Sequence, residues 1–216
     1  MGQTKESLNL GQYKAFVFDL DGTLLDSGTY HARAFAEVVK EQSGYLLTPE
    51  EHREVFASHS TAFCPVLNAR HGLSLDPEKI LTAKRQRVKE LFEVKLFEGA
   101  VEFLERWKGR CRFGLATNSP EGFVAPALED AGLRKYFDAI VTATDVHRRK
   151  PDPEIFQIAF QRLGVLPEET LVFEDQRIGV ESAEAAGAKV IAVDNQQMVD
   201  FPPNIPVRTW KELLEE

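Results

Sequence analysis

Five short apolar runs, the last four alternating with helix-like segments, constrain the fold of this chain more than any other feature. Each run is bounded by turn or charge signals, which is typical of buried strands. The runs are Lys14–Phe18, Arg112–Ala116, Ala139–Ala143, Thr170–Phe173 and Lys189–Val193. Strands that alternate with helices over short links form parallel sheets with helices on both faces. The chain is therefore predicted to be an α/β protein with a doubly wound, parallel, Rossmann-like sheet.

Three predicted helices connect the last four strands. The first, Pro120–Ala131, follows Ser119 as its N-cap, with proline in the first turn where its missing N–H costs nothing. The second, Pro153–Leu163, follows Asp152 in the same way, and the third is Gln176–Ala186.

The connection between the first two strands is too long for a simple crossover. The 93 residues from 19 to 111 lie there, about seventy of them in the segment 28–96, whereas a whole βαβ unit needs about thirty. The segment reads almost entirely as helix, so we expect residues 28–96 to form an inserted α-helical cap domain and residues 12–27 and 97–216 to form the core. The expected cap helices are Thr29–Glu41, Pro49–Ala57, Pro65–Arg70 and Pro77–Leu96, and the core helices at Gly99–Trp107 and Trp210–Leu214 complete the set.

Charge and composition narrow the list of partners. The net charge is −8 with no block of Lys or Arg, which argues against nucleic acid or an anionic membrane as the main partner. Cys64 and Cys111 lie far apart, without histidines at metal-ligand spacing, so neither zinc nor a disulfide framework is indicated. No apolar leader or membrane-length run is present, and we expect a cytoplasmic monomer or weak homodimer.

Polar side chains follow four of the five predicted strands. In an open α/β sheet, ligands bind beyond the carboxyl ends of the strands. Topology alone therefore predicts that these side chains share one crevice. They are Asp19 and Asp21 after the first strand, Thr117 and Asn118 after the second, Lys150 after the third, and Glu174 and Asp175 after the fourth.

Each of these features also has a purely structural explanation. Asp21 with the following glycine is compatible with a tight turn, and Thr117 with a helix cap. Lys150 is compatible with a solvated loop, and Glu174 and Asp175 with an N-terminal acidic pair that the helix dipole favours. Capping alone does not predict that all four groups follow strand ends.

The excess of negative charge in this crevice points to a cation. Two carboxylates about 4 Å apart repel by roughly 4 kcal/mol at an effective dielectric near 20. Asp19, Asp21, Glu174 and Asp175 face only Lys150 as a compensating charge. The donors are all hard oxygens, which select Mg²⁺ over zinc, and Mg²⁺ held by few carboxylates usually shares its sphere with a substrate phosphate. The sequence therefore predicts phosphoryl chemistry.

The same residues belong to four motifs that occur in order along the chain: DLDGT (Asp19–Thr23), LATNS (Leu115–Ser119), RKPDPEIF (Arg149–Phe156) and VFEDQRIGVESAEAAG (Val172–Gly187). In these motifs the chain resembles the haloacid dehalogenase-like superfamily of phosphotransferases. The helical insertion is similar to the α-helical cap of that family, and the nearest likeness is to the β-phosphoglucomutase-like and sugar-phosphate phosphatase branch.

The resemblance implies a role for each core position. Asp19 is expected to be the nucleophile that forms an aspartyl-phosphate, and Asp21 the general acid and base. The metal ligands implied are Asp19, Asp21 through its backbone carbonyl, and Asp175, with Glu174 close by. The phosphoryl group is expected to contact Thr117, Asn118 and Lys150. Dehalogenases lack the second acid, so the presence of Asp21 disfavours cleavage of a carbon–halogen bond.

The cap is expected to select the substrate. His31 is a candidate for contact with the substrate or with the general acid, and a structural histidine at the domain hinge is the alternative. Lys84 aligns with a phosphate-binding lysine of relatives, and a solvated helix charge is the alternative. Thr61 stands where the mutase pattern has arginine, which favours a phosphatase.

Three functions follow from these observations. The first is a Mg²⁺-dependent phosphatase acting on a small phosphorylated metabolite, most simply a sugar phosphate. The second is a phosphomutase that shares the first half-reaction. The third is a phospho-accepting signalling module of the receiver type, against which the cap and Asp21 argue.

Overall fold

The computed structural model describes residues 8–57, 63–91, 93–195 and 200–216. The chain forms two compact units. The core unit comprises Met1–Leu25 and Lys95–Glu216, and the cap unit comprises Asp26–Val94.

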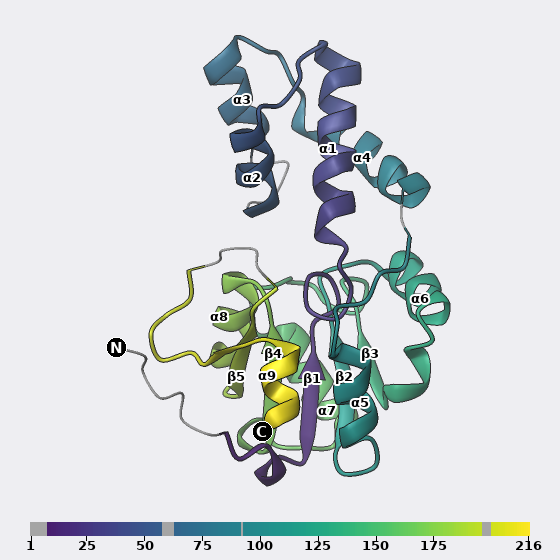
Figure 1. The fold of residues 1–216 in the computed structure, drawn as a ribbon, viewed down its shortest axis with the longest axis vertical. Coiled ribbons are helices and arrows are strands. Elements are labelled where there is room, and N and C mark those ends of the chain that lie inside the picture. The colour runs from purple at the N-terminus through teal and green to yellow at the C-terminus, as the bar shows by residue number, and fades with distance from the viewer. Residues whose placement is uncertain (1–7, 58–62, 92, 196–199) are drawn as a thin grey trace. The chain divides into compact units, whose positions relative to one another are not determined.

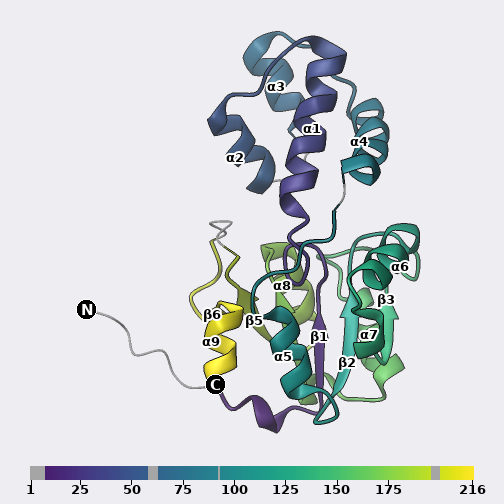
Figure 2. The same cartoon turned by 45° about the vertical axis from the view of Figure 1, so that its right-hand side comes forward.

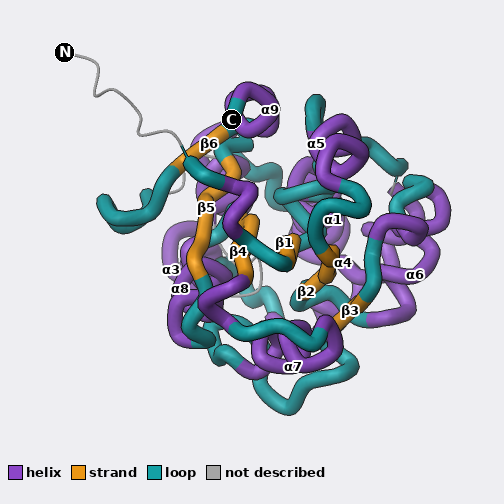
Figure 3. Tube along the Cα trace, turned by 90° about the horizontal axis from the view of Figure 1, so that it is seen from below, coloured by secondary structure: helices purple, strands orange, loops and turns teal. Residues whose placement is uncertain are grey.

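The core unit is built on one six-stranded sheet in which every neighbouring pair of strands is parallel. The strand order is β3-β2-β1-β4-β5-β6, so the first strand lies in the middle. Figure 3 shows the strands in this order along the sheet. Their bounds are β1 Ala15–Phe18, β2 Arg112–Ala116, β3 Ala139–Val141, β4 Thr170–Glu174, β5 Lys189–Val193 and β6 Val207–Arg208.

Strand register brings the ends of the central strands to one edge. Phe18, the last residue of β1, pairs with Leu115 of β2 and with Phe173 of β4. The ladder continues one residue further, because the Asp19 backbone N–H donates to the Phe173 carbonyl at 3.0 Å. Since parallel strands point the same way, the residues that follow β1, β2 and β4 must lie side by side.

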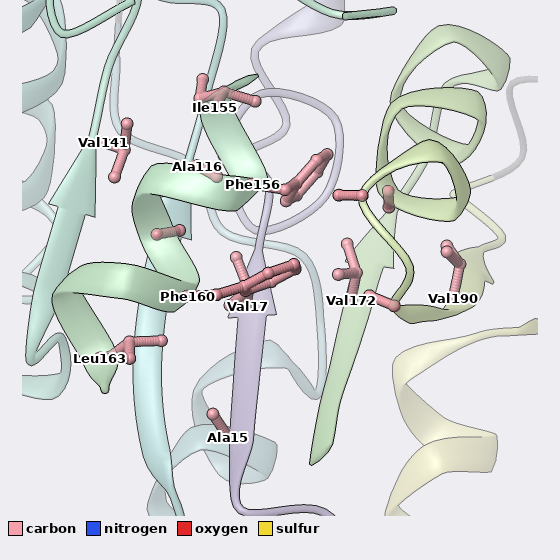
Figure 4. Close-up of a cluster of buried hydrophobic side chains, with 14 of the residues drawn as sticks. Ala15, Val17, Ala116, Val141, Ile155, Phe156, Phe160, Leu163, Val172 and Val190 are labelled. Carbon is pink, nitrogen blue, oxygen red and sulfur yellow. The ribbon is translucent and has the colours of Figure 1, made fainter. Parts of the chain in front are cut away.

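Alternation along β1 assigns its side chains to two different cores. Val17 packs with residues of α7 and α8, a cluster drawn in Figure 4. Phe16 and Phe18 point to the opposite face, where they pack against Phe103 of α5 with ring centroids 5.9 and 6.4 Å apart. Trp210 of α9 joins this aromatic face, 5.2 Å from Phe103. Figures 2 and 3 show α5 and α9 on one face of the sheet and α7 and α8 on the other.

The helices of the core unit follow the strands in the expected order (Figure 1). Their bounds are α5 Ala100–Trp107, α6 Glu121–Asp130, α7 Glu154–Leu163, α8 Arg177–Ala185 and α9 Trp210–Glu215, with single 3₁₀ turns at η1 Leu10–Gln12, η2 Arg134–Tyr136 and η3 Pro167–Glu169.

The cap unit is helical and has its own apolar core. Phe35 and Val39 of α1 are fully buried there, together with Leu67 of α3 and Ile80 of α4. Phe35 and Val39 lie one helical turn apart, as Cys64 and Leu67 of α3 do, which gives each of these two helices an apolar face. The helices are α1 Gly28–Ser43, α2 Pro49–Ala57, α3 Cys64–His71 and α4 Pro77–Leu91.

The fold class is as predicted, and the differences lie at element ends and in one additional short strand. β3 stops at Val141 rather than Ala143, because Thr142 turns to bond the Asp145 carboxylate through both its backbone N–H and its hydroxyl. The predicted end of α4 at Leu96 is wrong, since the helix stops at Leu91 and Leu96 forms an isolated bridge with Leu25. The two-residue strand β6 was not predicted. Within the described residues, no helix is long and apolar enough to span a membrane.

Candidate active site

Lys150 is the centre of the polar cluster at the carboxyl edge of the sheet. Its Nζ donates to Asp19 Oδ1 and Glu174 Oε1, each at 2.6 Å, and to the Ala116 carbonyl at 2.8 Å. Only 6% of the residue is exposed, which excludes the solvated-loop explanation. One ammonium thus joins the ends of β1, β2 and β4.

Asn118 fixes the backbone from which this lysine extends. Its Oδ1 accepts from the Lys150 backbone N–H at 3.1 Å, and its Nδ2 donates to the Lys150 carbonyl at 3.4 Å. Two opposed hydrogen bonds from one amide restrict the loop in both directions. The Asn118 side chain therefore acts on the site through Lys150.

Glu174 is bonded through both of its carboxylate oxygens. Oε1 accepts from Lys150, and Oε2 accepts from the backbone N–H groups of Asp175 and Gln176 at 3.0 and 3.1 Å. The carboxylate packs against Gly179 of α8, where a Cβ atom would overlap it. Glu174 thus holds the lysine and the start of its own loop, which corrects the idea that it serves as a helix-capping acid.

Asp175 lies against the turn that follows β1. Its Oδ1 accepts from the Thr23 hydroxyl at 2.9 Å, and its Oδ2 accepts from Asn195 Nδ2 at 3.2 Å. Gly22 has a φ of +85° and leaves no room for a side chain, because a Cβ there would overlap the Asp175 carboxylate. This close approach explains why glycine follows Asp21 in the DLDGT motif.

Burial and charge crowding decide the electrostatics of the cluster. Burial raises the pKa of Asp19 to about 8, although the charge of Lys150 opposes the shift. Burial, followed by the charges of Glu174 and Asp19, raises the pKa of Asp175 well above its usual range. Burial alone would lower the pKa of Lys150, but the charges of Asp19 and Glu174 raise it.

These carboxylates fit a hard divalent cation. Asp19, Glu174 and Asp175 each offer an oxygen, and the three atoms lie within 4.8 Å of one another. When all are ionised, three carboxylates face a single ammonium and leave negative charge unbalanced. The donors are exclusively oxygens, which suits Mg²⁺. Because Lys150 and backbone N–H groups already occupy Glu174, the better ligands in this set are Asp19 and Asp175.

Asp21 belongs to the turn after β1 and contacts Ser119, which follows β2. The serine hydroxyl donates to Asp21 Oδ2 at 2.5 Å. The prediction that Ser119 caps the following helix is therefore wrong: α6 begins at Glu121, its N-cap is Pro120, and the Glu121 backbone N–H donates to the Thr144 hydroxyl at 3.2 Å. Thr117 is buried, and its Oγ1 accepts from the Ser119 backbone N–H at 3.1 Å.

The structure therefore brings the sequence-predicted core residues together at one edge of the core unit. Sequence reasoning missed Ser119 and Asn195 as members of the cluster. A signal for Asn195 was present, because it follows β5 just as the other polar residues follow their strands. His31 lies on α1 and Lys84 on α4, both in the cap unit, and their proposed contacts with substrate stay predictions. Thr61 lies outside the described residues.

Residues 16–193 match the family model described as "Haloacid dehalogenase-like hydrolase". The chain belongs to the haloacid dehalogenase-like hydrolase family. Two relatives illustrate its branch of this hydrolase family. A phosphorylated carbohydrates phosphatase from Thermotoga maritima is 34% identical over 181 residues, which cover 82% of this chain and 83% of the relative. Fructose-1-phosphate phosphatase YqaB from Escherichia coli is 31% identical over 186 residues, which cover 84% of this chain and 97% of the relative.

A solved structure extends the likeness of this haloacid dehalogenase-like hydrolase over both units. It is that of a candidate β-phosphoglucomutase from Thermotoga maritima, which is 29% identical with a TM-score of 0.75. The match covers 94% of this chain and 97% of the other. The predicted superfamily and its β-phosphoglucomutase-like, sugar-phosphate phosphatase branch are thereby confirmed.

Proposed function

We propose that this hydrolase is a Mg²⁺-dependent phosphatase that releases phosphate from a small phosphorylated metabolite, a sugar phosphate in the first instance. The names of the two relatives support the substrate class, because both are phosphatases of phosphorylated carbohydrates. The observation that carries the proposal is the buried Lys150, which holds one oxygen of Asp19 at 2.6 Å at the edge of the sheet.

The first half-reaction uses Asp19 as the nucleophile. Lys150 bonds Oδ1, which orients Oδ2 of the same carboxylate as the attacking atom. A bond forms between Oδ2 and phosphorus while the ester P–O bond breaks, and Asp21 gives a proton to the departing alcohol oxygen. The products of this step are the free alcohol, an aspartyl-phosphate at Asp19 and ionised Asp21.

The second half-reaction returns the enzyme to its starting state. Asp21, now a carboxylate, takes a proton from water as the water oxygen attacks phosphorus. The bond between phosphorus and Asp19 then breaks, inorganic phosphate leaves, and Asp21 is protonated again. One carboxyl group thus serves as acid and then as base.

The remaining groups stabilise the phosphoryl oxygens. Lys150 and the Thr117 hydroxyl are the phosphate-binding side chains, and Asn118 contributes by holding the Lys150 backbone. Asp19 and Asp175, with the Asp21 backbone carbonyl, would hold Mg²⁺, which when bound supplies positive charge to the transferring group.

Replacing the nucleophile tests the proposal. We expect Asp19→Asn to lower the turnover of p-nitrophenyl phosphate by at least about a thousandfold, since no other path to the covalent intermediate exists. Asp130→Asn, a matched change at an exposed residue of α6, is expected to retain full activity. Circular dichroism checks that both variants fold. Turnover by Asp19→Asn close to that of the wild type would refute the assignment.

A phosphomutase is the second candidate, favoured by the candidate β-phosphoglucomutase among the solved relatives. The two functions differ in what accepts the phosphoryl group, water or a second sugar. Incubation with a hexose 1-phosphate, followed by separate assays for inorganic phosphate and for the hexose 6-phosphate, distinguishes them. Phosphate release supports the phosphatase, and isomer formation without release would replace it by the mutase.

A further inference from the structure

Asn195 is a polar residue beside the site that the mechanism above does not use. It lies two residues after the end of β5, at the same edge of the sheet as the acidic cluster. Its Nδ2 donates to the Gly22 carbonyl and to Asp175 Oδ2, the latter at 3.2 Å. One amide group therefore joins the turn after β1 to the loop after β4.

The Asp175 carboxylate is held from both sides by neutral donors. Thr23 donates to Oδ1 at 2.9 Å, while Asn195 donates to Oδ2. The carboxylate also packs directly on Gly22, so it has little freedom to rotate or shift. Only 1% of Asp175 is exposed, and water is therefore a poor substitute for a lost protein donor.

We propose that Asn195 is a positioning residue for the metal site and acts through Asp175. An ionised carboxylate has about four lone-pair positions on its two oxygens, so one donor on each oxygen leaves others for a cation. An amide holds the carboxylate without neutralising its charge, whereas a second ammonium would compete with the metal. Hydrogen bonds of this kind to a metal-ligating carboxylate fix its direction and are a general means of tuning affinity.

The bond to Gly22 gives Asn195 a second, simultaneous effect. Gly22 lies between Asp21, the general acid, and Thr23, which bonds Asp175. By accepting from Asn195, the Gly22 carbonyl fixes this turn relative to the Asp175 loop. The relative position of Asp19 and Asp175, the two better metal ligands, thus depends on a residue just after β5 that is not itself a ligand.

The inference rests on the Mg²⁺ dependence proposed above, and Mg²⁺ binding is its readout. Isothermal titration calorimetry with MgCl₂ on the 216-residue chain gives a Kd without any substrate. We expect Asn195→Ala to raise that Kd by about 10- to 100-fold. Asn204→Ala is the matched control, because Asn204 Nδ2 donates to Glu184 Oε1 at the same 3.2 Å on the exposed surface; its Kd should stay that of the wild type.

Two further measurements separate positioning from loss of structure. Thermal unfolding in EDTA reports whether each variant is folded before metal is added. Asn195→Leu restores the bulk of the side chain without its donor, and it should bind Mg²⁺ as weakly as Asn195→Ala. A wild-type Kd in either folded variant would overturn the role of Asn195 and leave the phosphatase proposal intact. Absence of Mg²⁺ binding by the wild-type protein would overturn both.

Discussion

At the scale of single residues, the serine that ends the LATNS motif (Leu115–Ser119) contacts Asp21 and does not cap a helix. The serine is fixed by its backbone, since its N–H donates to Thr117 Oγ1 and its carbonyl accepts from the Ala143 N–H at 3.0 Å. Its hydroxyl is thereby aimed at Asp21 Oδ2. In the proposed mechanism, this contact orients the carboxyl group that exchanges a proton with the substrate.

The Ser119 hydroxyl should matter most for substrates with a poor leaving group. Ser119→Ala should lower kcat for a sugar phosphate by about tenfold, because the poor leaving group needs a well-aligned proton donor. Turnover of p-nitrophenyl phosphate should change much less, since its leaving group needs little protonation. Ser119→Thr keeps the hydroxyl and should restore the sugar-phosphate rate. Equal losses of kcat on both substrates would indicate a structural role of Ser119 instead. The control is Ser43→Ala, which removes a hydroxyl that donates to the Val39 carbonyl in the cap unit and should leave both rates unchanged.

Sequence reasoning predicted the charged members of the site and two neutral ones, Thr117 and Asn118, but it missed the neutral supports Ser119 and Asn195. Asp19, Lys150 and Asp175 are recognisable because charged residues at strand ends require a partner. Ser119 and Asn195 carry no such requirement. A serine before a proline and a helix predicts a cap equally well, and only a contact 98 residues away in sequence decides between the two roles.

At the scale of elements, helix α8 packs so closely on the last residue of β4 that one position of the helix admits no side chain. Gly179 has an ordinary helical backbone, yet a Cβ there would overlap the Glu174 carboxylate. Because Glu174 is itself bonded to Lys150, this helix determines indirectly where the lysine lies.

We therefore expect opposite effects from the same substitution in two helices. Gly179→Ala should cost about 1–3 kcal/mol of unfolding free energy through overpacking, and it should lower phosphatase activity by displacing Lys150. Gly122 lies in α6 with no atom near the position of a Cβ. Gly122→Ala should stabilise the protein by about 0.4–1 kcal/mol without affecting activity. Urea denaturation measures the unfolding free energy of both variants. A Gly179→Ala variant as stable as the wild type would contradict the packing argument.

Element identity was easier to predict from sequence than element ends. Buried parallel strands give continuous apolar runs that no surface helix shows, so the five longer strands were recognised. The end of α4 at Leu91 was missed because helix-forming residues continue beyond it, and tertiary pairing of Leu96 with Leu25 overrides their preference. β6 has only two residues, too few for any periodicity.

At the scale of the whole molecule, the cap unit has a stability determinant of its own. Glu51 of α2 is 4% exposed and accepts from the Thr48 backbone N–H at 2.9 Å and from the Tyr45 hydroxyl at 3.0 Å. His71 Nε2 lies 2.6 Å from its other oxygen, and the Tyr45 and His71 rings stack. Burial alone would raise the pKa of Glu51, but these hydrogen bonds outweigh it and lower the pKa to about 2.

The pH dependence of unfolding tests this determinant. A carboxyl group whose pKa is lowered by folding stabilises the native state above its unfolded pKa of 4.5, and this contribution is lost as the pH falls toward 2. Glu51→Gln should therefore be less stable than the wild type near neutral pH, with the deficit narrowing below pH 4.5. Glu50→Gln, at the exposed neighbouring position, should show no such trend. Urea denaturation between pH 3 and 7 gives the curves, and a deficit independent of pH would contradict the prediction.

At this scale the sequence predicts an insertion after the first strand, because an interval of 93 residues between two strands is too long for a simple crossover. The cluster around Glu51 was not predictable. Its members are ordinary surface residue types, and their burial depends on how three segments of the cap pack together.

The central position of β1 has a consequence for how the chain is made. β1 ends at Phe18, but its two neighbours begin only at Arg112 and Thr170, so the first strand made has no strand partner until more of the chain has been synthesised. The cap unit, contiguous in sequence from Asp26 to Val94, has all its residues available earlier. We expect the cap helices of the nascent chain to fold while β1, an apolar strand, still has no strand partner. Strand pairings over such long sequence separations form slowly and leave the chain open to aggregation.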